Sequence, residues 1–246
     1  MAAVDVHWID LDEPGAGIGA FYDLLDDAER ARAARFRFGR DRRRYIVRHG
    51  RLRELLGHYL GCAPSSVRLL RDRFGKPSVA VTDLRFNVSK SHGLALYAVS
   101  RDREVGCDIE RRDAGFAADH IAEQFFSTLE SHTLRALAPE RQTEAFFNCW
   151  TRKEAYVKAR GDGLTVALDG FDVSLAPGEP AALLRGCDGW SVASFEPASG
   201  FQAAVVAAGA DCHLNLCGAD RWLSGSWPVS SRRRSPASRD RSVHRS

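Results

Sequence analysis

Three residues spaced by four lie in the stretch NCWTRKEAYVKARGDGL, residues 148–164: Trp150, Glu154 and Lys158. Such spacing puts side chains on one face of a helix, and Gly161 is the residue type that ends a helix in a left-handed conformation. One face would then carry a ring, a carboxylate and an ammonium. Alone, Glu followed by Lys four residues later is commonly a solvated pair worth about 0.2–0.5 kcal/mol. Other residues must distinguish a surface pair from half of a site.

Two carboxylates share one face of a predicted strand. In REVGCDIE the apolar side chains point one way, and Asp108 and Glu110 point the other way. An exposed edge strand whose acids pair with the next two arginines, Arg111 and Arg112, is one interpretation. The other is a site for a hard cation, because carboxylate oxygens suit Mg²⁺, which also takes phosphate oxygens of a substrate.

Serines and lysines supply groups that bind anions. FNVSKSHG is predicted to be a strand that runs into a polar turn, where Ser89 and Lys90 offer donors. A G-K-P turn leaves Lys76 exposed. An ordinary polar hairpin is the alternative at each place. Only four of the 35 basic residues are Lys, which favours positions where a compact ammonium is needed rather than a planar guanidinium.

These motifs form one coherent set. Two strand carboxylates, a helical Glu and Lys, a serine-rich strand end and an exposed lysine would together hold a divalent metal and a phosphorylated ligand. One carboxylate and one lysine would remain for proton transfer.

Composition limits the class of protein. The chain has 246 residues with 44% hydrophobic and 27% charged residues, as soluble globular proteins have. The acidic beginning argues against a signal peptide, and no apolar run would cross a bilayer. Six cysteines without a C-x-x-C pair predict reduced thiols and no zinc site. We therefore expect a cytoplasmic protein without membrane contact.

The basic excess lies at one end. Residues 231–246 hold six Arg and one Asp, a net charge of +5, which leaves −2 on the remaining chain. This argues against a specific nucleic-acid binder, and we expect residues 227–246 to be a disordered Ser/Arg tail.

The pattern of elements predicts an α+β fold with two similar lobes. A strand, two helices and further strands come first; helices and three strands of one small sheet follow. Asp41 is the predicted N-cap of the second helix, and Gly61 its end. We assign residues 1–110 to an N-terminal lobe and 111–226 to a C-terminal lobe. We expect a pseudo-twofold relation between the lobes and a ligand cleft between them.

The order G-K-P, F-N-x-S-x-S, V-G-x-D-I-E and W-x-x-K-E-A-x-x-K-x-x-G-x-G-L resembles the 4′-phosphopantetheinyl transferases of the two-lobed, single-chain class, over about residues 26–164 and loosely to residue 208. The resemblance implies transfer of the phosphopantetheine arm of coenzyme A to a serine of an apo acyl or peptidyl carrier protein. Adenosine 3′,5′-bisphosphate would be released. It also implies a monomer and a role in secondary metabolism.

The resemblance also implies roles for individual residues. Asp108, Glu110 and Glu154 would hold Mg²⁺ against the pyrophosphate, Glu154 would take the serine proton, and Lys158 would neutralise or protonate the departing phosphate. The residues implied for the 3′-phosphate and adenine end are Lys76, Ser89, Lys90, Arg32 and Arg71, with Arg44 as a weaker candidate.

The chain departs from the family pattern at one place. The family usually has His where Lys90 stands, and here a His follows two residues later, at position 92. An ammonium binds a phosphate at least as well as an imidazole does, and its charge does not titrate near pH 6.5. We therefore expect coenzyme A binding to be retained, with less dependence on pH.

Two other functions fit the motifs in part. A magnesium-dependent nuclease uses acids and a lysine, but it needs a basic groove that the body of this chain lacks. A non-catalytic module that binds coenzyme A or carrier proteins would need the same binding residues without the chemistry. Label transfer to a carrier protein separates the second alternative from the transferase, and DNA cleavage tests the first.

Overall fold

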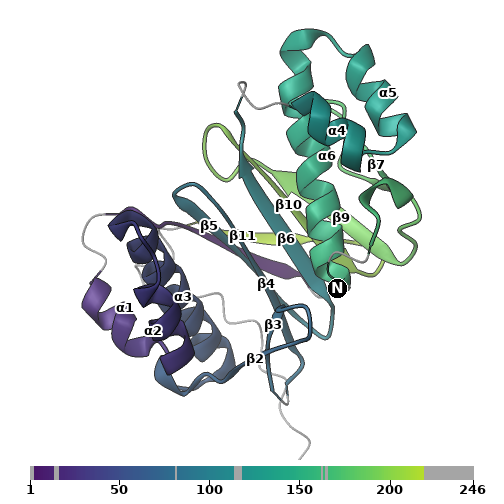
Figure 1. Ribbon diagram of the computed structural model, residues 1–246. Coiled ribbons are helices and arrows are strands. Elements are labelled where there is room, and N and C mark those ends of the chain that lie inside the picture. The colour runs from purple at the N-terminus through teal and green to yellow at the C-terminus, as the bar shows by residue number, and fades with distance from the viewer. Residues whose placement is uncertain are drawn as a thin grey trace, which may run out of the picture.

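The computed structural model describes residues 3–13, 17–80, 82–113, 118–161, 163 and 166–218, so the expected tail at 227–246 lies outside the described residues. Figure 1 shows two groups of helices on either side of a central set of strands. The elements of the first half are β1 (Val4–Asp10), α1 (Ile18–Leu24), α2 (Asp27–Ala34), α3 (Gly39–Leu60), β2 (Leu69–Arg71), β3 (Pro77–Val79), β4 (Leu84–Ser91) and β5 (Leu94–Arg101). Those that follow are β6 (Val105–Arg111), α4 (Ala118–Phe125), α5 (Thr128–Ala136), α6 (Pro139–Arg160), β7 (Asp172–Val173), β8 (Leu183–Arg185), β9 (Trp190–Phe195), β10 (Phe201–Ala208) and β11 (Leu214–Cys217).

The first half is a sheet covered by α3. Its strands lie in the order β11-β1-β5-β4, and the apolar stripe of α3 packs with α1 and the sheet in one core cluster. Gly61 ends α3 in the left-handed conformation, with φ +67°, as predicted. The predicted N-cap at Asp41 is wrong: α3 begins at Gly39 with Phe38 as its N-cap, and Asp41 lies in the first turn, where its charge suits the helix dipole.

The second half places α6 across a three-stranded sheet. The order of that sheet is β6-β10-β9, and aromatic residues of α4 and α6 pack in its core cluster. The prediction of the final strands was partly wrong. β9 and β10 belong to the sheet, but β7 pairs with β8 in a separate ribbon, and β6 supplies the third strand. The helices predicted for this half are α4, α5 and α6, and Pro139 begins the last of them.

A third core cluster joins the halves. Val105, Cys107 and Ile109 of β6 pack there with residues of β1, β5 and β10, as the alternation in the sequence predicted. β11 returns from the second half and pairs in parallel with β1. The α+β class with two helix-on-sheet halves is therefore confirmed, while the pseudo-twofold relation and the boundaries at residues 110 and 226 stay predictions. Among the described residues no helix has the length and apolar character to cross a membrane.

A buried ion pair holds α6 in place. The Lys153 side chain is 0% exposed, and its ammonium lies 2.7 Å from a carboxylate oxygen of Glu130 on α5. The same ammonium donates to the carbonyls of Leu168 and Phe171, and Glu130 accepts the amide of Val173. This network fixes α6 at Lys153, the residue directly before Glu154.

We predict that Lys153→Met destabilises the fold by about 3–5 kcal/mol, because it leaves the Glu130 carboxylate buried without its counter-charge. Chemical unfolding followed by circular dichroism measures the change. Arg135→Met is the matched control, since Arg135 forms an exposed pair with Glu123 that is worth at most about 1 kcal/mol. Equal stability changes in the two variants would contradict the prediction.

Candidate active site

Within residues 145–159 of α6, one strip is open while the remaining side chains are buried. Between residues 145 and 159 every side chain is buried except Trp150, Glu154 and Lys158, which are half-buried. The spacing seen in the sequence is therefore the spacing of the only accessible positions along this stretch. A solvated surface pair would have exposed neighbours, so this interpretation of Glu154 and Lys158 is wrong.

Strand β6 brings its carboxylates under this strip because α6 approaches it unusually closely. A Cβ on Gly106 would lie 2.2 Å from the carbonyl oxygen of Ala155 and 2.2 Å from the amide nitrogen of Ala159. Only a glycine allows the helix backbone to come so near. Asp108, two residues further along the same face of the strand, is 2% exposed, which excludes the exposed edge strand considered from the sequence.

Strand β4 faces these acids with two serines. Ser89 donates to Asp108 at 2.8 Å and Ser91 donates to Glu110 at 2.7 Å, so each pair is separated by the same 19 residues in sequence. The predicted turn follows the strand, but it begins only at residue 92, because β4 continues through Ser91. Ser89 and Ser91 point inward, and Lys90 is exposed between them, since neighbouring residues of a strand face opposite ways. Lys90 therefore lies on the face of β4 away from the carboxylates.

Lys158 closes this arrangement from the helix. Its ammonium lies 2.5 Å from Asp108 Oδ1 and 3.2 Å from Ser89 Oγ. Burial would lower the pKa of Lys158, but the ion pair and hydrogen bond with Asp108 outweigh it and the pKa is raised. Lys158 thus stays charged at neutral pH, beside a carboxylate and a hydroxyl that come from two other elements.

Burial disfavours the ionised form of both glutamates, Glu110 and Glu154. Burial raises the pKa of Glu110 from 4.5 to about 7, and repulsion from Asp108 adds to this. Burial also raises the pKa of Glu154, with opposite effects from Lys158 and Asp108. Carboxyl groups whose pKa is raised by burial are typical of functional sites, where they bind a cation or take part in proton transfer.

The carboxylates of Asp108, Glu110 and Glu154 are not arranged as a complete metal site. Across the described part of the chain no three His, Cys, Asp or Glu side chains gather closely enough to hold a metal. Their chemistry nevertheless fits one: Asp108 Oδ2 is buried without a hydrogen-bond partner, and the three acids repel each other. A divalent cation would satisfy both conditions after small side-chain rotations.

Three arginines gather on the first half, beside Tyr45. Arg48 on α3 lies 5.7 Å from the ring centroid of Tyr45. Burial lowers the pKa of Arg48, and the charges of Arg71 and Arg32 lower it further, which places both predicted residues within electrostatic range of it. None of the three has an ion-pair partner among the described residues. Arg48 was missed from the sequence, because it is one of many arginines in its segment.

Two further candidates have partners of their own. Arg44 forms an ion pair with Asp12, and its Nε donates at 2.8 Å to the same carboxylate. The ammonium of Lys76, expected to be exposed, is directed at the end of α6: it donates to the carbonyl of Ala159 at 3.0 Å and lies 3.3 Å from Glu104. Its side chain is 18% exposed. An open groove of about 500 Å³, which Lys76, Arg85, Glu104 and Arg160 help to line, lies at this junction.

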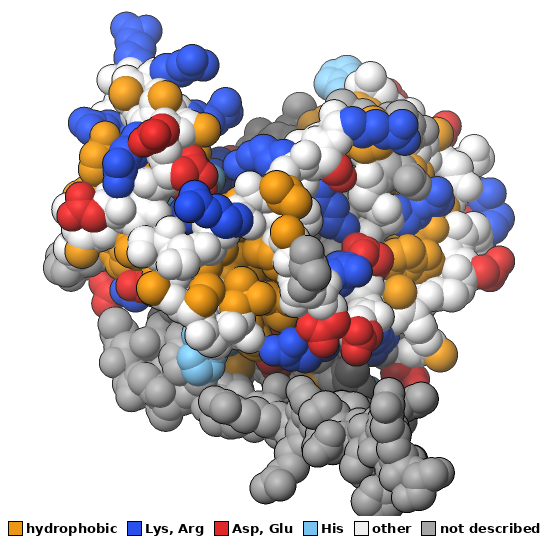
Figure 2. Space-filling view, turned by 90° about the horizontal axis from the view of Figure 1, so that it is seen from below, with side chains coloured by type: hydrophobic (Ala, Val, Ile, Leu, Met, Phe, Trp, Pro, Cys, Tyr) orange, Lys and Arg blue, Asp and Glu red, His pale blue; other side chains and the backbone are white. Residues whose placement is uncertain are grey.

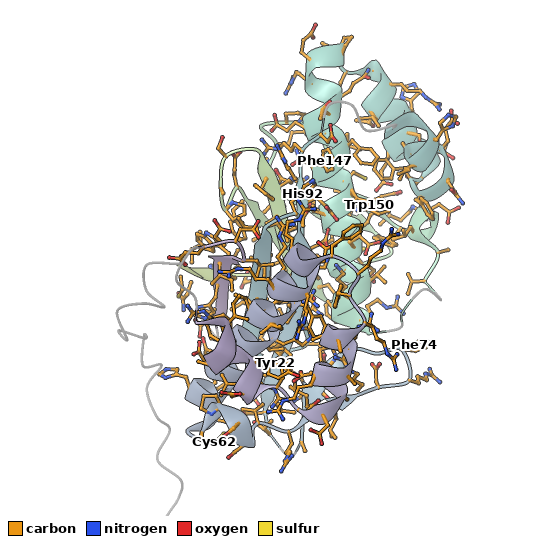
Figure 3. The ribbon with its side chains drawn as sticks, turned by 60° about the vertical axis from the view of Figure 1, so that its left-hand side comes forward. Tyr22, Cys62, Phe74, His92, Phe147 and Trp150 are labelled. Atoms are coloured by element: carbon orange, nitrogen blue, oxygen red, sulfur yellow. The ribbon has the colours of Figure 1, made fainter. Side chains whose placement is uncertain are left out.

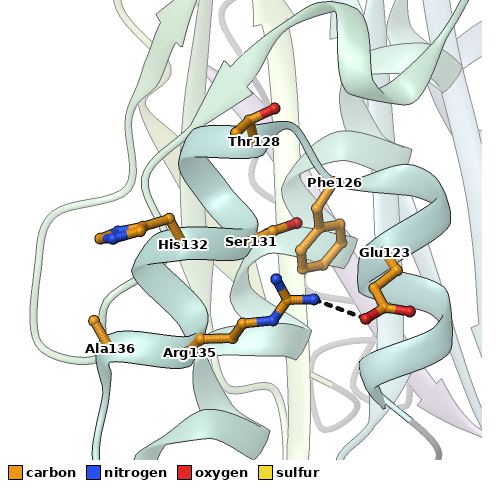
Figure 4. Close-up of a pocket in the computed structure, with 7 residues that line it drawn as sticks. All are labelled: Glu123, Phe126, Thr128, Ser131, His132, Arg135 and Ala136. Atoms are coloured by element: carbon orange, nitrogen blue, oxygen red, sulfur yellow. Dashed lines mark hydrogen bonds and ion pairs between the residues drawn. The ribbon is translucent and has the colours of Figure 1, made fainter.

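A second hollow, of about 580 Å³, lies between α4 and α5 in the other half (Figure 4). Arg135 pairs with Glu123 across it, and none of the predicted site residues lines it. In Figure 2 basic and acidic side chains are interspersed over the face shown, without a continuous basic band. The face shown in Figure 2 therefore lacks the basic groove that a nuclease would need.

Comparison with known proteins gives matches along most of the chain. The model of the 4′-phosphopantetheinyl transferase superfamily matches residues 104–206, and that of a 4′-phosphopantetheinyl transferase N-terminal region matches residues 16–101. The chain is 39% identical over 211 residues to the 4′-phosphopantetheinyl transferase HetI of Nostoc sp., covering 83% of this chain and 88% of that protein. It is 29% identical to the 4′-phosphopantetheinyl transferase Sfp of Bacillus subtilis, covering 63% and 68% of the two chains. A structure of Thermotoga maritima holo-[acyl-carrier-protein] synthase aligns at TM-score 0.35 and 18% identity, over 44% of this chain and 64% of the other.

We predict that Gly106→Ala separates α6 from β6, because its methyl group would overlap the helix backbone. The expected cost is about 3 kcal/mol, at the upper end for overpacking, since the atoms in the way belong to backbone. Unfolding in urea measures it. Gly39→Ala is the control: Gly39 is exposed at the start of α3, and its Cβ would meet no atom within 4 Å. A stability loss at Gly106 no larger than that at Gly39 would show that the close approach is not needed.

We predict that Glu110→Gln stabilises the metal-free protein at pH 8 by about 2 kcal/mol and not at pH 4.5. Below pH 4.5 the carboxyl is protonated in both states; between pH 4.5 and 7 the unfolded chain ionises first, so the wild type loses stability as pH rises. Unfolding in EDTA at both pH values measures this. Glu140→Gln, at an exposed carboxylate in the first turn of α6, is the control and should bring no gain in stability at pH 8, because the helix dipole favours a negative charge there. A Glu110 variant less stable than wild type at pH 8 would contradict the prediction.

Proposed function

The chain belongs to the 4′-phosphopantetheinyl transferase superfamily, and we propose how its own residues carry out the transfer of 4′-phosphopantetheine from coenzyme A to a serine of an apo acyl or peptidyl carrier protein. Adenosine 3′,5′-bisphosphate is the other product. The observation that carries the proposal is the meeting of Lys158 and Ser89 at the Asp108 carboxylate, with Glu154 one helical turn away. Phosphoryl transfer requires mainly positioning and charge neutralisation, which such a junction provides.

Asp108, Glu110 and Glu154 would hold the magnesium ion. When bound, Mg²⁺ would neutralise the pyrophosphate of coenzyme A and stabilise the leaving bisphosphate. The buried oxygen of Asp108 and the raised pKa values of Glu110 and Glu154 support this assignment. Ser91 orients Glu110 through its 2.7 Å hydrogen bond. Ser89 and Asp108 are separated by the same 19 residues in sequence, so the two serine–carboxylate pairs repeat one arrangement.

Glu154 and Lys158 divide the proton chemistry between them. Glu154 lies on the open strip of α6, and burial raises its pKa, which makes its carboxylate a stronger acceptor for the proton of the carrier serine. Lys158 is charged and neutralises or protonates the departing phosphate. Their spacing of one helical turn lets both act on the same pair of substrates.

The nucleotide end of coenzyme A would lie over the first half. Arg32, Arg48 and Arg71 have no acidic ion-pair partner among the residues that the structure describes, which suits a site for the doubly charged 3′-phosphate. From β4, Ser89 would contact coenzyme A beside the carboxylates, whereas Lys90, on the opposite face of the strand, would contact its 3′-phosphate end. With Lys90 in place of the usual His, we propose that binding of the 3′-phosphate depends little on pH around 6.5.

The protein would act as a monomer, because the two halves already form the junction within a single chain. We place it in the cytoplasm. A non-catalytic module that binds coenzyme A remains the second candidate; the place of Lys90, on the face of β4 opposite the carboxylates, is the observation that keeps it open.

The test is the intact mass of a purified apo carrier protein after incubation with this protein, coenzyme A and Mg²⁺. We expect a gain of roughly 340 Da, the covalently attached arm, which EDTA abolishes. Glu154→Gln should slow the transfer at least about 100-fold through loss of its proton acceptor. Glu140→Gln on the same helix is the control and should leave the rate unchanged. Binding of coenzyme A without any mass gain on several carriers would favour the non-catalytic module.

A further inference from the structure

The turn that follows α6 is covered by a hairpin from the other half of the chain. A Cβ on Gly161 would lie 3.5 Å from Cδ of Lys76, and a Cβ on Gly163 would lie 2.8 Å from the ring of Phe74. Both glycines have positive φ, +74° and +61°. The tip between β2 and β3 thus rests on two glycines whose backbone does not suit a side chain, and at Gly163 there is also no room for one. Figure 3 shows Phe74 beside the end of α6.

Charged contacts fasten the same two segments. The Lys76 ammonium donates to the carbonyl of Ala159, one of the last carbonyls of α6, where the helix dipole favours a cation. It also pairs with Glu104, which in turn accepts from Arg85 on β4 at 2.8 Å. A compact ammonium can serve the carbonyl and the carboxylate together, which accounts for a lysine in a chain that otherwise uses arginine.

This geometry differs from that of a phosphate ligand. The ammonium of Lys76 is directed at protein atoms of the second half, and its side chain is only 18% exposed. The carbonyl that it holds belongs to the residue directly after Lys158, whose ammonium contacts Ser89. Any movement of this last helical turn would move Lys158 away from β4.

We propose that Lys76, Glu104, Phe74 and Gly163 form a clasp between the two halves, and that Lys76 is a positioning residue that sets Lys158 against Ser89. Lys76 and Ala159 are 83 residues apart in sequence, and their contact holds the G-K-P turn against the G-x-G turn after α6. Its kinetic consequence rests on the proposed function, whereas its structural consequence does not.

The first test compares coenzyme A with 3′-dephospho-coenzyme A as substrates. In Lys76→Met, which keeps the aliphatic stem, we expect kcat/KM to fall about tenfold for both, as for the loss of one charged hydrogen bond. Their ratio should stay that of the wild type, with the loss in kcat. Glu104→Gln should have the same effect, and the double variant should be no slower than either single one. Asp83→Asn, at an exposed carboxylate paired with Arg101, is the control and should change nothing.

Two kinetic outcomes would overturn the proposal. A Lys76→Met variant that loses its preference for coenzyme A over the 3′-dephospho form would make Lys76 a ligand of the 3′-phosphate. A variant that uses both substrates as well as the wild type does would show that the contact positions nothing.

The second test needs no transfer activity. Amide hydrogen exchange in the free protein should become about tenfold faster in Lys76→Met and in Glu104→Gln, and only in the last turn of α6 and in the β2–β3 hairpin. Exchange that accelerates throughout the chain, or nowhere, would overturn the clasp. If the wild type transfers no label while this local acceleration is found, the proposed function fails and the clasp stands.

Discussion

The close contact between α6 and β6 at Gly106 is the constraint on which the rest of the site depends. A helix that normally stands a side-chain layer away from a sheet here touches it with its backbone. This contact brings Lys158 to within 2.5 Å of Asp108, and it leaves the open strip of α6 directly above the acids of β6. The buried pair between Lys153 and Glu130 holds the helix from its other side. The chemistry at the junction therefore depends on a packing distance before it depends on any charged residue.

The charges at this junction are not balanced within the protein itself. Lys158 compensates Asp108, but Glu110 and Glu154 have no cation of their own in the contacts described, and burial makes their ionisation costly. Serines from β4 orient the acids without adding charge. Such an arrangement makes the ligand-free protein less stable, and joint binding of a cation and a polyanion would offset that loss of stability. Binding of the proposed metal ion would thereby be coupled to binding of the substrate.

Much of the site could be predicted from the sequence, because strand alternation and helical spacing are local. They placed Asp108 with Glu110, and Glu154 with Lys158, on the correct faces. What they could not provide are contacts between distant segments: Ser91 on Glu110, Arg48 beside Arg32 and Arg71, and Lys76 on the carbonyl of Ala159. The pairing of β11 with β1 was missed for the same reason, since four residues far from their partner carry no distinguishing pattern. Gly106 was visible, but its role depends on which helix lies above it.

The parallel strand β11 has a consequence for how the chain can be divided. Because β11 lies against β1, the sheet of the first half is completed by residues 214–217, and the whole second half lies in the chain connection from β5 to β11, two strands of that sheet with β1 between them. The first half is thus discontinuous in sequence. Cutting the chain after β5 or β6 would leave β1 as an open edge, ready to pair with another molecule, so the two halves are not separable modules although each has its own core.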